Sequence, residues 1–590
     1  MVQNTLKTSQ AERSYLRASI YAFPLIACAS FLFLLWRAKF GYCFLDEPFI
    51  ISQAQRLFQG NALIVDEWHV AQTSGSLVLP FYMLFHLFSD SNEGIMLCFR
   101  YVYCVLWWLS CLLIYKKLSV SEGKIASALV FLYLILFSPL DYMTLSYTSA
   151  GLAACLFLCC MMYRVSAETP SFSWGKACIF SLLWIVLTLS SPLMALFYIL
   201  FFLFFLVGSL VEAKRTKYCY FRNVRKLCIA SLPIIVVVCL LYLYVFIFSR
   251  VEFSKFLPSL GFVLNDPQHE KRNLIKAILS TPGYVIINAP LFTLACVVVF
   301  IVGTVKNCRK LRLPLFSVCA LLYIAAQLSY TKSVLPGYEP DVPLLNQQMM
   351  YMAFLGLPAF ALLEKRPYKQ FLVFQGMGWF YTLMQNLSSN TRIMTIAMAL
   401  TVAGVSGVLC CVRLFRELHE QYRGNKLPGR LAAIVICLVM TVQIGSQLCS
   451  RLYRTYYDAS LSQLTEEIKY GSAKGLFTTK ENAQLHNTLY ENMDHLLSGI
   501  DTQGKKLLSL AEMPHIYLDA EMDFGTFSSW NCYLGKEIMT QRLEDYLSIN
   551  PENTPDIVFA GSENDLLPFV ENAYSCTEYR GSYLFVRTDD

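Results

Sequence analysis

The segment Leu45-Asp46-Glu47-Pro48-Phe49-Ile50, residues 45–50, places two adjacent carboxylates directly after the first long apolar stretch of the chain. Pro48 suits the first position of a helix, so the sequence predicts that a helix begins there with Glu47 as its N-cap. Apolar residues then recur at helical spacing over 49–58. We therefore expect a short amphipathic helix on the bilayer surface, with Asp46 and Glu47 kept ionised near its positive end.

A second polar cluster, formed by Asp66, Glu67, Trp68 and His69, follows this expected helix. Tryptophan favours the membrane interface, so the cluster is either an interfacial anchor or part of a functional site. His69 has no HxxH or HxH partner, and its spacing therefore does not predict a metal site. The next apolar stretch, 77–88, is shorter than the roughly 20 residues that cross a bilayer, so we expect it to dip into the surface or pack on the helices.

The composition indicates a polytopic α-helical membrane protein. The chain has 590 residues, of which 56% are hydrophobic and 15% are charged, whereas soluble domains average about 25% charged residues. The first apolar stretch has no small-residue cleavage site and is predicted to be an uncleaved span. Apolar stretches bounded by charges predict about thirteen transmembrane helices, at 19–37, 96–115, 125–140, 148–163, 177–190, 193–211, 228–248, 284–305, 314–330, 348–363, 370–386, 393–412 and 431–449.

The distribution of lysine and arginine predicts the orientation of these spans. With a cytoplasmic N-terminus, the inner segments carry 26 cations and the outer loops carry ten. The positive-inside rule then places the carboxylate loop outside. The net charge of +7 reflects cytoplasmic anchoring and gives no reason to invoke nucleic acid. No evident eukaryotic retrieval signal is present, which favours a multi-pass protein of a bacterial plasma membrane.

The sequence changes character after about residue 451, where short helical and β patterns begin to alternate. This alternation predicts a soluble extracytoplasmic α/β domain over 451–590, after a transmembrane domain over 1–450 with a large first outer loop at 38–95. No GxGxxG or P-loop is present, so nucleotide binding has no support. The expected helices lie at 461–468, 483–497, 538–547 and 566–574, and the expected strands at 475–478, 506–510, 516–518, 556–560 and 583–586.

The predicted outer loops differ in charge. The first is rich in acidic residues, the loop over 250–283 is basic and includes Lys271 and Arg272, and a smaller loop over 332–346 carries Tyr338. Carboxylates beside cations at one membrane face suit a reaction in which a base activates an acceptor while cations hold a leaving phosphate. The basic loop is alternatively a contact for anionic lipid.

The first outer loop also resembles that of the GT-C glycosyltransferases, in the branch of the protein O-mannosyltransferases and lipid A aminoarabinose transferases. The resemblance is carried by Leu45-Asp46-Glu47 after the first span, by the helix closed at Gly60, and by Leu79-Pro80-Phe81-Tyr82 ahead of Arg100. It implies a GT-C-like fold over most of 1–450. It also implies transfer of a sugar from a polyprenyl-phosphate donor, usually with inversion, to an acceptor on the non-cytoplasmic side.

The resemblance assigns roles to three residues. It implies that Asp46 is the catalytic base, that Glu47 shapes the acceptor site, and that Arg100 lies close to the carrier phosphate. The chain departs from the aminoarabinose transferases, which have an arginine soon after the acidic pair and a Lys-Pro-Pro later in the loop. Here Pro48 and Phe49 follow the pair and Ser76-Leu77-Val78-Leu79-Pro80 replaces the later motif, so that subfamily's sugar and acceptor do not carry over.

The sequence thus predicts a membrane glycosyltransferase with Asp46 and Glu47 as catalytic residues. The acceptor is a glycan, a lipid or a protein; the scheme requires no metal, although it leaves room for a divalent ion. The expected substrate contacts are Arg100, Asp66, Glu67, Trp68, His69, Lys271, Arg272 and Tyr338. A secondary transporter or lipid-linked sugar flippase is the main alternative, but it would place ionisable residues within its spans. The third hypothesis is a non-catalytic assembly protein whose α/β domain binds a partner.

Overall fold

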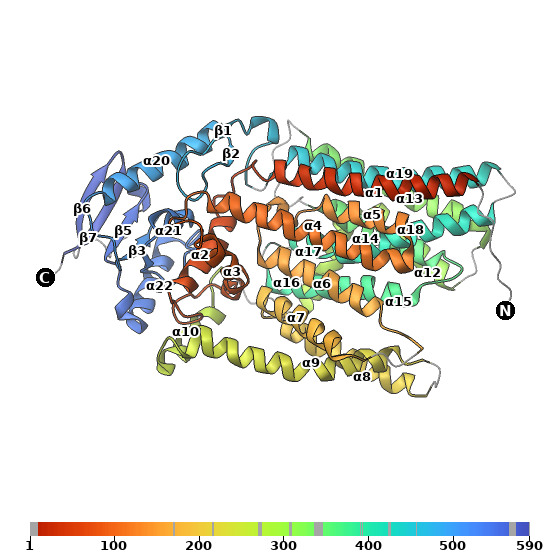
Figure 1. Ribbon diagram of the computed structural model, residues 1–590, viewed down its shortest axis with the longest axis horizontal. Helices are drawn as coiled ribbons and strands as arrows, with labels where there is room; N and C mark the ends of the chain where they lie inside the picture. The colour runs from red at the N-terminus through yellow and green to blue at the C-terminus, as the bar shows by residue number, and fades with distance from the viewer. Residues whose placement is uncertain are drawn as a thin grey trace.

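The computed structural model describes residues 10–168, 172–214, 218–268, 274–305, 309–335, 346–389, 391, 393–422, 426–455, 457–565 and 574–588. A helical bundle forms one end of the molecule and a small β-sheet the other, with α2 (Asp46–Phe58) and α3 (Gly75–Phe85) between them (Figure 1). The bundle helices are α1 (Gln10–Arg37), α4 (Ile95–Glu122), α5 (Lys124–Ile135), α6 (Tyr147–Tyr163), α7 (Trp174–Ser190), α8 (Met194–Glu212), α9 (Tyr220–Leu243), α11 (Leu274–Asn288), α12 (Pro290–Val305), α13 (Arg312–Val334), α14 (Gln347–Ala361), α16 (Met377–Ser388), α17 (Ile393–Ala399), α18 (Thr401–Gln421) and α19 (Lys426–Tyr453).

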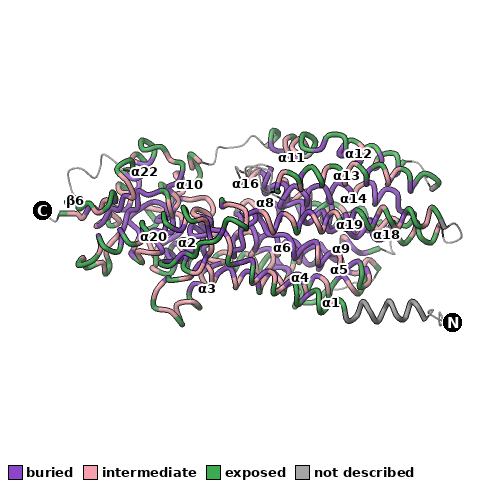
Figure 2. Tube along the Cα trace, turned by 90° about the horizontal axis from the view of Figure 1, so that it is seen from above, coloured by how far each residue is buried: buried purple, intermediate pink, exposed green. Residues whose placement is uncertain are grey.

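The bundle identifies a multi-pass membrane protein. Within the described ranges, five helices are long and apolar enough to cross a membrane, or seven if two bent pairs each form one span. Outer helices such as α9 also expose large apolar side chains, including Val237 and Leu240, which a bilayer would cover. Exposed positions likewise follow the outer side of α12 (Figure 2). Every predicted span overlaps a helix, but the count of thirteen spans stays a prediction.

The helix α2 differs from its prediction in two respects. It begins at Asp46 after Leu45, and no side chain caps it, so the prediction that Glu47 is the N-cap is wrong. Proline has no backbone N–H, and the N–H groups of the first helical turn have no partner within the helix. Proline therefore fits several positions of that turn, and Pro48 predicts the first residue of α2 only to within two residues. All residues from Glu47 to Leu57 are buried, so the helix does not lie on a bilayer surface with a solvated polar side.

The polar side of α2 is covered by the C-terminal part of the chain. Gln55 Nε2 donates to the carbonyl oxygen of Tyr517 at 3.1 Å, and Arg56 Nη2 donates to that of Thr526 at 2.8 Å. The short helix α3 packs on α2, and Gly75 permits this approach because a Cβ there would lie 2.9 Å from Gln53 Cβ. The polar side of α2, which was predicted to face water, is therefore covered by protein.

The C-terminal part is an α/β unit, as predicted. Its five-stranded sheet has the order β4-β3-β5-β7-β6; β3 runs parallel to β4 and β5, and β7 runs antiparallel to β5 and β6. Leu507 and Ile557 pack with α20 and α21, whereas Leu508 and Val558 pack with α22 and Trp68. Both faces of the sheet are thus covered. The elements are β1 (Glu466–Glu467), β2 (Phe477–Thr478), α20 (Lys480–Leu497), β3 (Lys506–Ser509), α21 (His515–Ala520), β4 (Asp523–Phe524), α22 (Lys536–Ile549), β5 (Ile557–Ala560), β6 (Tyr574–Tyr579) and β7 (Ser582–Arg587).

Two of the predicted elements in this unit are wrong. The expected strand at 516–518 lies within the helix α21, because a three-residue apolar run does not distinguish a strand from a short buried helix. The expected helix at 461–468 is a 3₁₀ turn at Leu461–Gln463 followed by β1. The expected helix at 566–574 falls almost wholly outside the described residues, and Tyr574 begins β6.

Candidate functional site

Glu47 and Arg100 are bound to each other at the junction of α2 and α4. Arg100 Nε donates to Glu47 Oε1 at 2.8 Å, and Arg100 Nη2 donates to the other carboxylate oxygen. Arg100 Nη1 also donates to the carbonyl oxygen of Ala38 at 2.9 Å. Both side chains are buried, so this two-point ion pair is well sheltered from water. The structure therefore brings together two of the three residues for which the resemblance implies a role.

A small recess lies beside this ion pair. It is bordered by the end of α1, the loop that leads to α2, the start of α4, the segment before α6 and the chain that follows α19. Residues from both ends of the bundle sequence therefore meet here. The lining residues are Arg37, Phe40, Gly41, Cys43, Glu47, Arg100, Asp141, Tyr142, Met143 and Thr455.

Asp46 lies close to this recess at the first position of α2, half-buried. Burial, followed by the charges of Tyr147 and Asp46, raises the pKa of Tyr142 in the recess lining. Burial, followed by the charges of Glu512 and Asp46, likewise raises the pKa of Cys532 in the C-terminal unit. Asp46 is thus within electrostatic reach of the recess and of the α/β unit, at a helix end that favours negative charge.

A group of buried arginines that the sequence reasoning missed lies behind the recess. Arg37 donates to the carbonyl oxygens of Arg451 at 2.7 Å, Phe40 at 2.8 Å and Arg454 at 2.8 Å. Arg451 is only 2% exposed, yet none of its guanidinium nitrogens has a hydrogen-bond partner among the described residues. The sequence held one indication of this group, because the first and the last predicted spans each have an arginine at their outer end.

Asp141 is the acid that faces Arg451, at 3.6 Å between Oδ1 and Nη1. It has a left-handed backbone, with φ of 58°, and its side chain is buried. Burial raises the pKa of Asp141 to about 6, although Arg451 and Arg37 act in the opposite direction. Buried arginines thus outnumber buried acids at this end of the bundle, which makes it suited to an anion. The arginines are Arg37, Arg100, Arg451 and Arg454, and the acids are Glu47, Asp141 and Asp458.

The predicted cluster over 66–69 lies in a separate place, between the first loop and the C-terminal unit. Asp66 accepts hydrogen bonds from Ala62 N at 2.6 Å and Asn553 Nδ2 at 3.0 Å. Glu67 pairs with Arg56 at 3.2 Å, and burial raises the pKa of Glu67. Both carboxylates thus hold the two parts of the molecule together.

The aromatic residues of the cluster border a second small recess. Trp68 is fully buried and stacks on Phe262 with a centroid distance of 4.4 Å. His69 Nδ1 accepts a hydrogen bond from Ala71 N at 3.1 Å. Substrate contact by Asp66, Glu67, Trp68 and His69 stays a prediction, and Lys271, Arg272 and Tyr338 lie outside the described residues.

Comparison with known proteins gives a distant structural likeness only. No family model and no curated protein matches the sequence. Among solved structures, the chain is similar to ArnT from Cupriavidus metallidurans in the apo state, with 10% sequence identity and a TM-score of 0.48 over 96% of this chain and 98% of that chain. A likeness at this level carries no inference about activity.

Proposed function

We propose that this protein is a membrane glycosyltransferase of the GT-C type, which transfers a sugar from a polyprenyl-phosphate donor to an acceptor at the outer membrane face. The observation that carries the proposal is the guanidinium of Arg451, which is buried, pairs with Asp141 at 3.6 Å and makes no hydrogen bond to a described residue. Asp141 also lines the recess, and the charge of Asp46 reaches Tyr142 in the same lining. The N–H groups of this guanidinium, which make no hydrogen bond to a described residue, can donate to a second anion such as a phosphate. A phosphate near a carboxylate is the arrangement that glycosyl transfer from a phosphate carrier needs.

In the proposed reaction, Asp46 accepts the proton of the acceptor hydroxyl or amine. The freed electron pair attacks the anomeric carbon, and the bond from that carbon to the phosphate oxygen breaks with inversion. The negative charge that develops on the departing polyprenyl phosphate is stabilised by the arginines of the recess. Glu47 acts through Arg100, because their ion pair fixes where the guanidinium points. The scheme requires no metal.

The test uses the purified full-length protein with a panel of radiolabelled polyprenyl-phosphate sugars and candidate acceptors. We expect transfer from at least one donor, and Asp46→Asn should lower transfer by roughly a hundredfold or more while donor binding stays near normal. Asp494→Asn, at an exposed position of α20, is the matched control and should retain activity.

Two outcomes would contradict the proposal. One is the absence of transfer from every donor together with movement of lipid-linked sugar across vesicles that contain the protein, which would favour the flippase. The other is wild-type turnover in Asp46→Asn when chemistry is rate-limiting, which would remove the base.

A further inference from the structure

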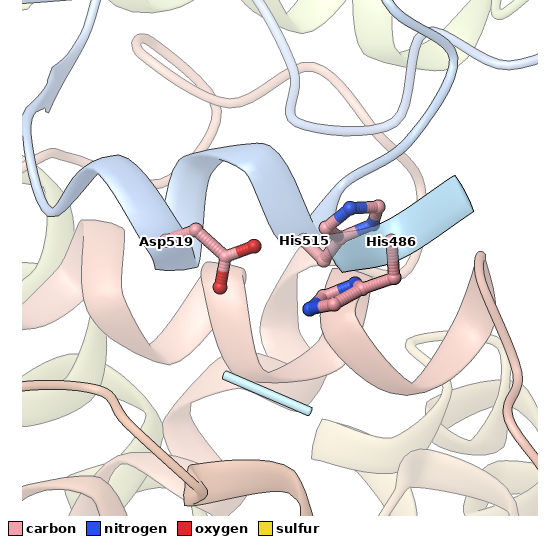
Figure 3. A group of neighbouring side chains, drawn as sticks. All are labelled: His486, His515 and Asp519. Atoms are coloured by element: carbon pink, nitrogen blue, oxygen red, sulfur yellow. The ribbon is translucent and has the colours of Figure 1, made fainter. Parts of the chain in front are cut away.

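Two histidines and an aspartate form a buried cluster in the C-terminal unit (Figure 3). His486 comes from α20, whereas His515 and Asp519 come from α21, four residues apart and therefore on one face of that helix. One ligand atom from each of the three residues lies within 4.8 Å of the others. The two imidazole rings lie with centroids 4.8 Å apart.

The cluster leaves polar atoms without partners. His515 is 0% exposed, and neither of its ring nitrogens has a hydrogen-bond partner among the described residues. Oδ2 of Asp519 is also buried without one, whereas Oδ1 accepts from Ser472 N at 2.6 Å. Buried polar atoms in folded proteins are nearly always satisfied, so these three atoms point to a ligand that completes the cluster.

His486 is already oriented as a metal ligand would be. Its Nε2 faces the carbonyl oxygen of Tyr470 at 3.1 Å, and since a carbonyl only accepts, this nitrogen carries the proton. Nδ1 then holds the lone pair, which accepts a hydrogen bond from the Tyr42 hydroxyl at 2.9 Å, so a bound metal would replace this hydrogen bond. A hydrogen bond from the second ring nitrogen to a backbone carbonyl is the usual support of a metal-bound histidine.

The donor set selects the class of ion. Two imidazoles and one carboxylate suit zinc and related divalent transition metals, whereas magnesium and calcium prefer oxygen ligands. Ligand atoms around tetrahedral zinc lie about 3.3 Å apart, so the three side chains would close by an ångström or so on binding.

We infer that His486, His515 and Asp519 bind a divalent transition-metal ion, with zinc as the preferred occupant. Nothing in the proposed transfer reaction uses this ion. Tyr42 covers the cluster, with its ring at 5.3 Å from that of His486 and 6.1 Å from that of His515. The site is therefore structural: it ties α20 to α21 beneath the loop that leads to Asp46.

Metal content of the purified full-length protein tests the inference directly. The protein, with any purification tag removed, is stripped with a chelator, reloaded with zinc, freed of excess ion and analysed by mass spectrometry of the elements. We expect about one zinc per chain in the wild type and less than about a tenth of that in His515→Gln and Asp519→Asn. The matched control is His495→Gln, an exposed histidine of the same helix α20, which should keep its zinc.

A second measurement decides the matter if the ligand variants fail to fold. Wild-type protein reloaded with cobalt should show the visible absorption of four-coordinate Co(II), and zinc should raise its thermal midpoint. Equal zinc content in wild type and the ligand variants, or the absence of both the cobalt spectrum and the thermal shift in the wild type, would overturn the inference. None of these readouts measures sugar transfer, so they succeed or fail independently of the proposed function.

Discussion

Glu47 and Arg100, 53 positions apart in the sequence, form a buried two-point ion pair that joins α2 to α4. The pair lies where the first loop leaves the bundle, and Arg100 also holds the carbonyl oxygen of Ala38 at the end of α1. The Arg100 guanidinium therefore links α4 to α2 and to the end of α1. The pair gives both residues a positioning function in addition to any contact they make with substrate.

We expect removal of either partner to destabilise the protein. Arg100→Leu or Glu47→Gln leaves an uncompensated buried group, which costs about 3 to 5 kcal/mol when a buried ion pair is broken. The double variant Glu47→Gln/Arg100→Leu should be more stable than the sum of the single changes predicts, because both charges are then absent. Thermal unfolding in detergent measures this, and strict additivity would show that the two side chains are not coupled.

Arg451 should behave differently from Arg100, because its guanidinium makes no hydrogen bond to a described residue. Arg451→Gln should therefore weaken binding of a polyprenyl-phosphate donor by about tenfold or more, the loss expected for one charge-assisted contact to phosphate. The change also leaves Asp141 without its ion-pair partner, so the thermal midpoint should fall as well, and donor affinity is compared between folded proteins. Lys39→Gln, an exposed cation near the same end of α1, serves as the control. Unchanged donor affinity in folded Arg451→Gln would remove this arginine from the phosphate site.

Asp141 should make stability depend on pH. Its folded pKa of about 6 lies above the ordinary value of 3.8, so between these values the folded state binds more protons than the unfolded state. Stability should then fall as the pH rises from about 4 to 6, by about 3 kcal/mol for this group, and stay low above that range. Asp141→Asn should flatten the difference in thermal midpoint between about pH 4 and about pH 6, the two ends of this window. An equally steep dependence in that variant would assign the effect to another group.

Cysteine labelling tests the predicted orientation. In a background stripped of reactive cysteines, cysteine placed at Glu93 or Glu563 should react with a membrane-impermeant reagent applied from outside, because both positions are exposed and are predicted to lie outside. Cysteine at Lys117, an exposed position predicted to be cytoplasmic, should react only after the membrane is opened. Labelling of Lys117→Cys in intact cells would overturn the orientation.

Local pattern located most of the elements, although it gave the wrong type at 461–468 and 516–518. Contacts between residues far apart in the chain did not follow from it. The helix α20 and the strands β3, β5 and β7 fall where alternation and apolar periodicity placed them. The burial of Gln55 and Arg56 did not follow from pattern, because their partners Tyr517 and Thr526 come more than 460 positions later. A polar stripe on a helix has the same sequence signature whether water or another part of the protein covers it.

The separation of residues along the chain also explains which parts of the site could be predicted from the sequence. Asp46, Glu47 and Arg100 lie within one loop and its flanking helices, so the sequence alone grouped them. The link from Arg37 to the backbone of Arg451 spans 414 positions, and no local spacing reports it. The cluster of His486, His515 and Asp519 is likewise assembled from two helices that only the tertiary fold brings together.

The hydrogen bond from Arg56 to Thr526 also has a consequence for biosynthesis. The donor emerges 470 positions before its acceptor, which at ordinary rates of translation is a delay of roughly 20 to 90 s. Throughout that interval Arg56 lacks the Thr526 carbonyl and has only its partners in the first loop, the carbonyl oxygen of Asp66 and the carboxylate of Glu67. Nascent chains stopped before the sheet is complete should therefore be inactive and readily degraded, however well their membrane helices have inserted.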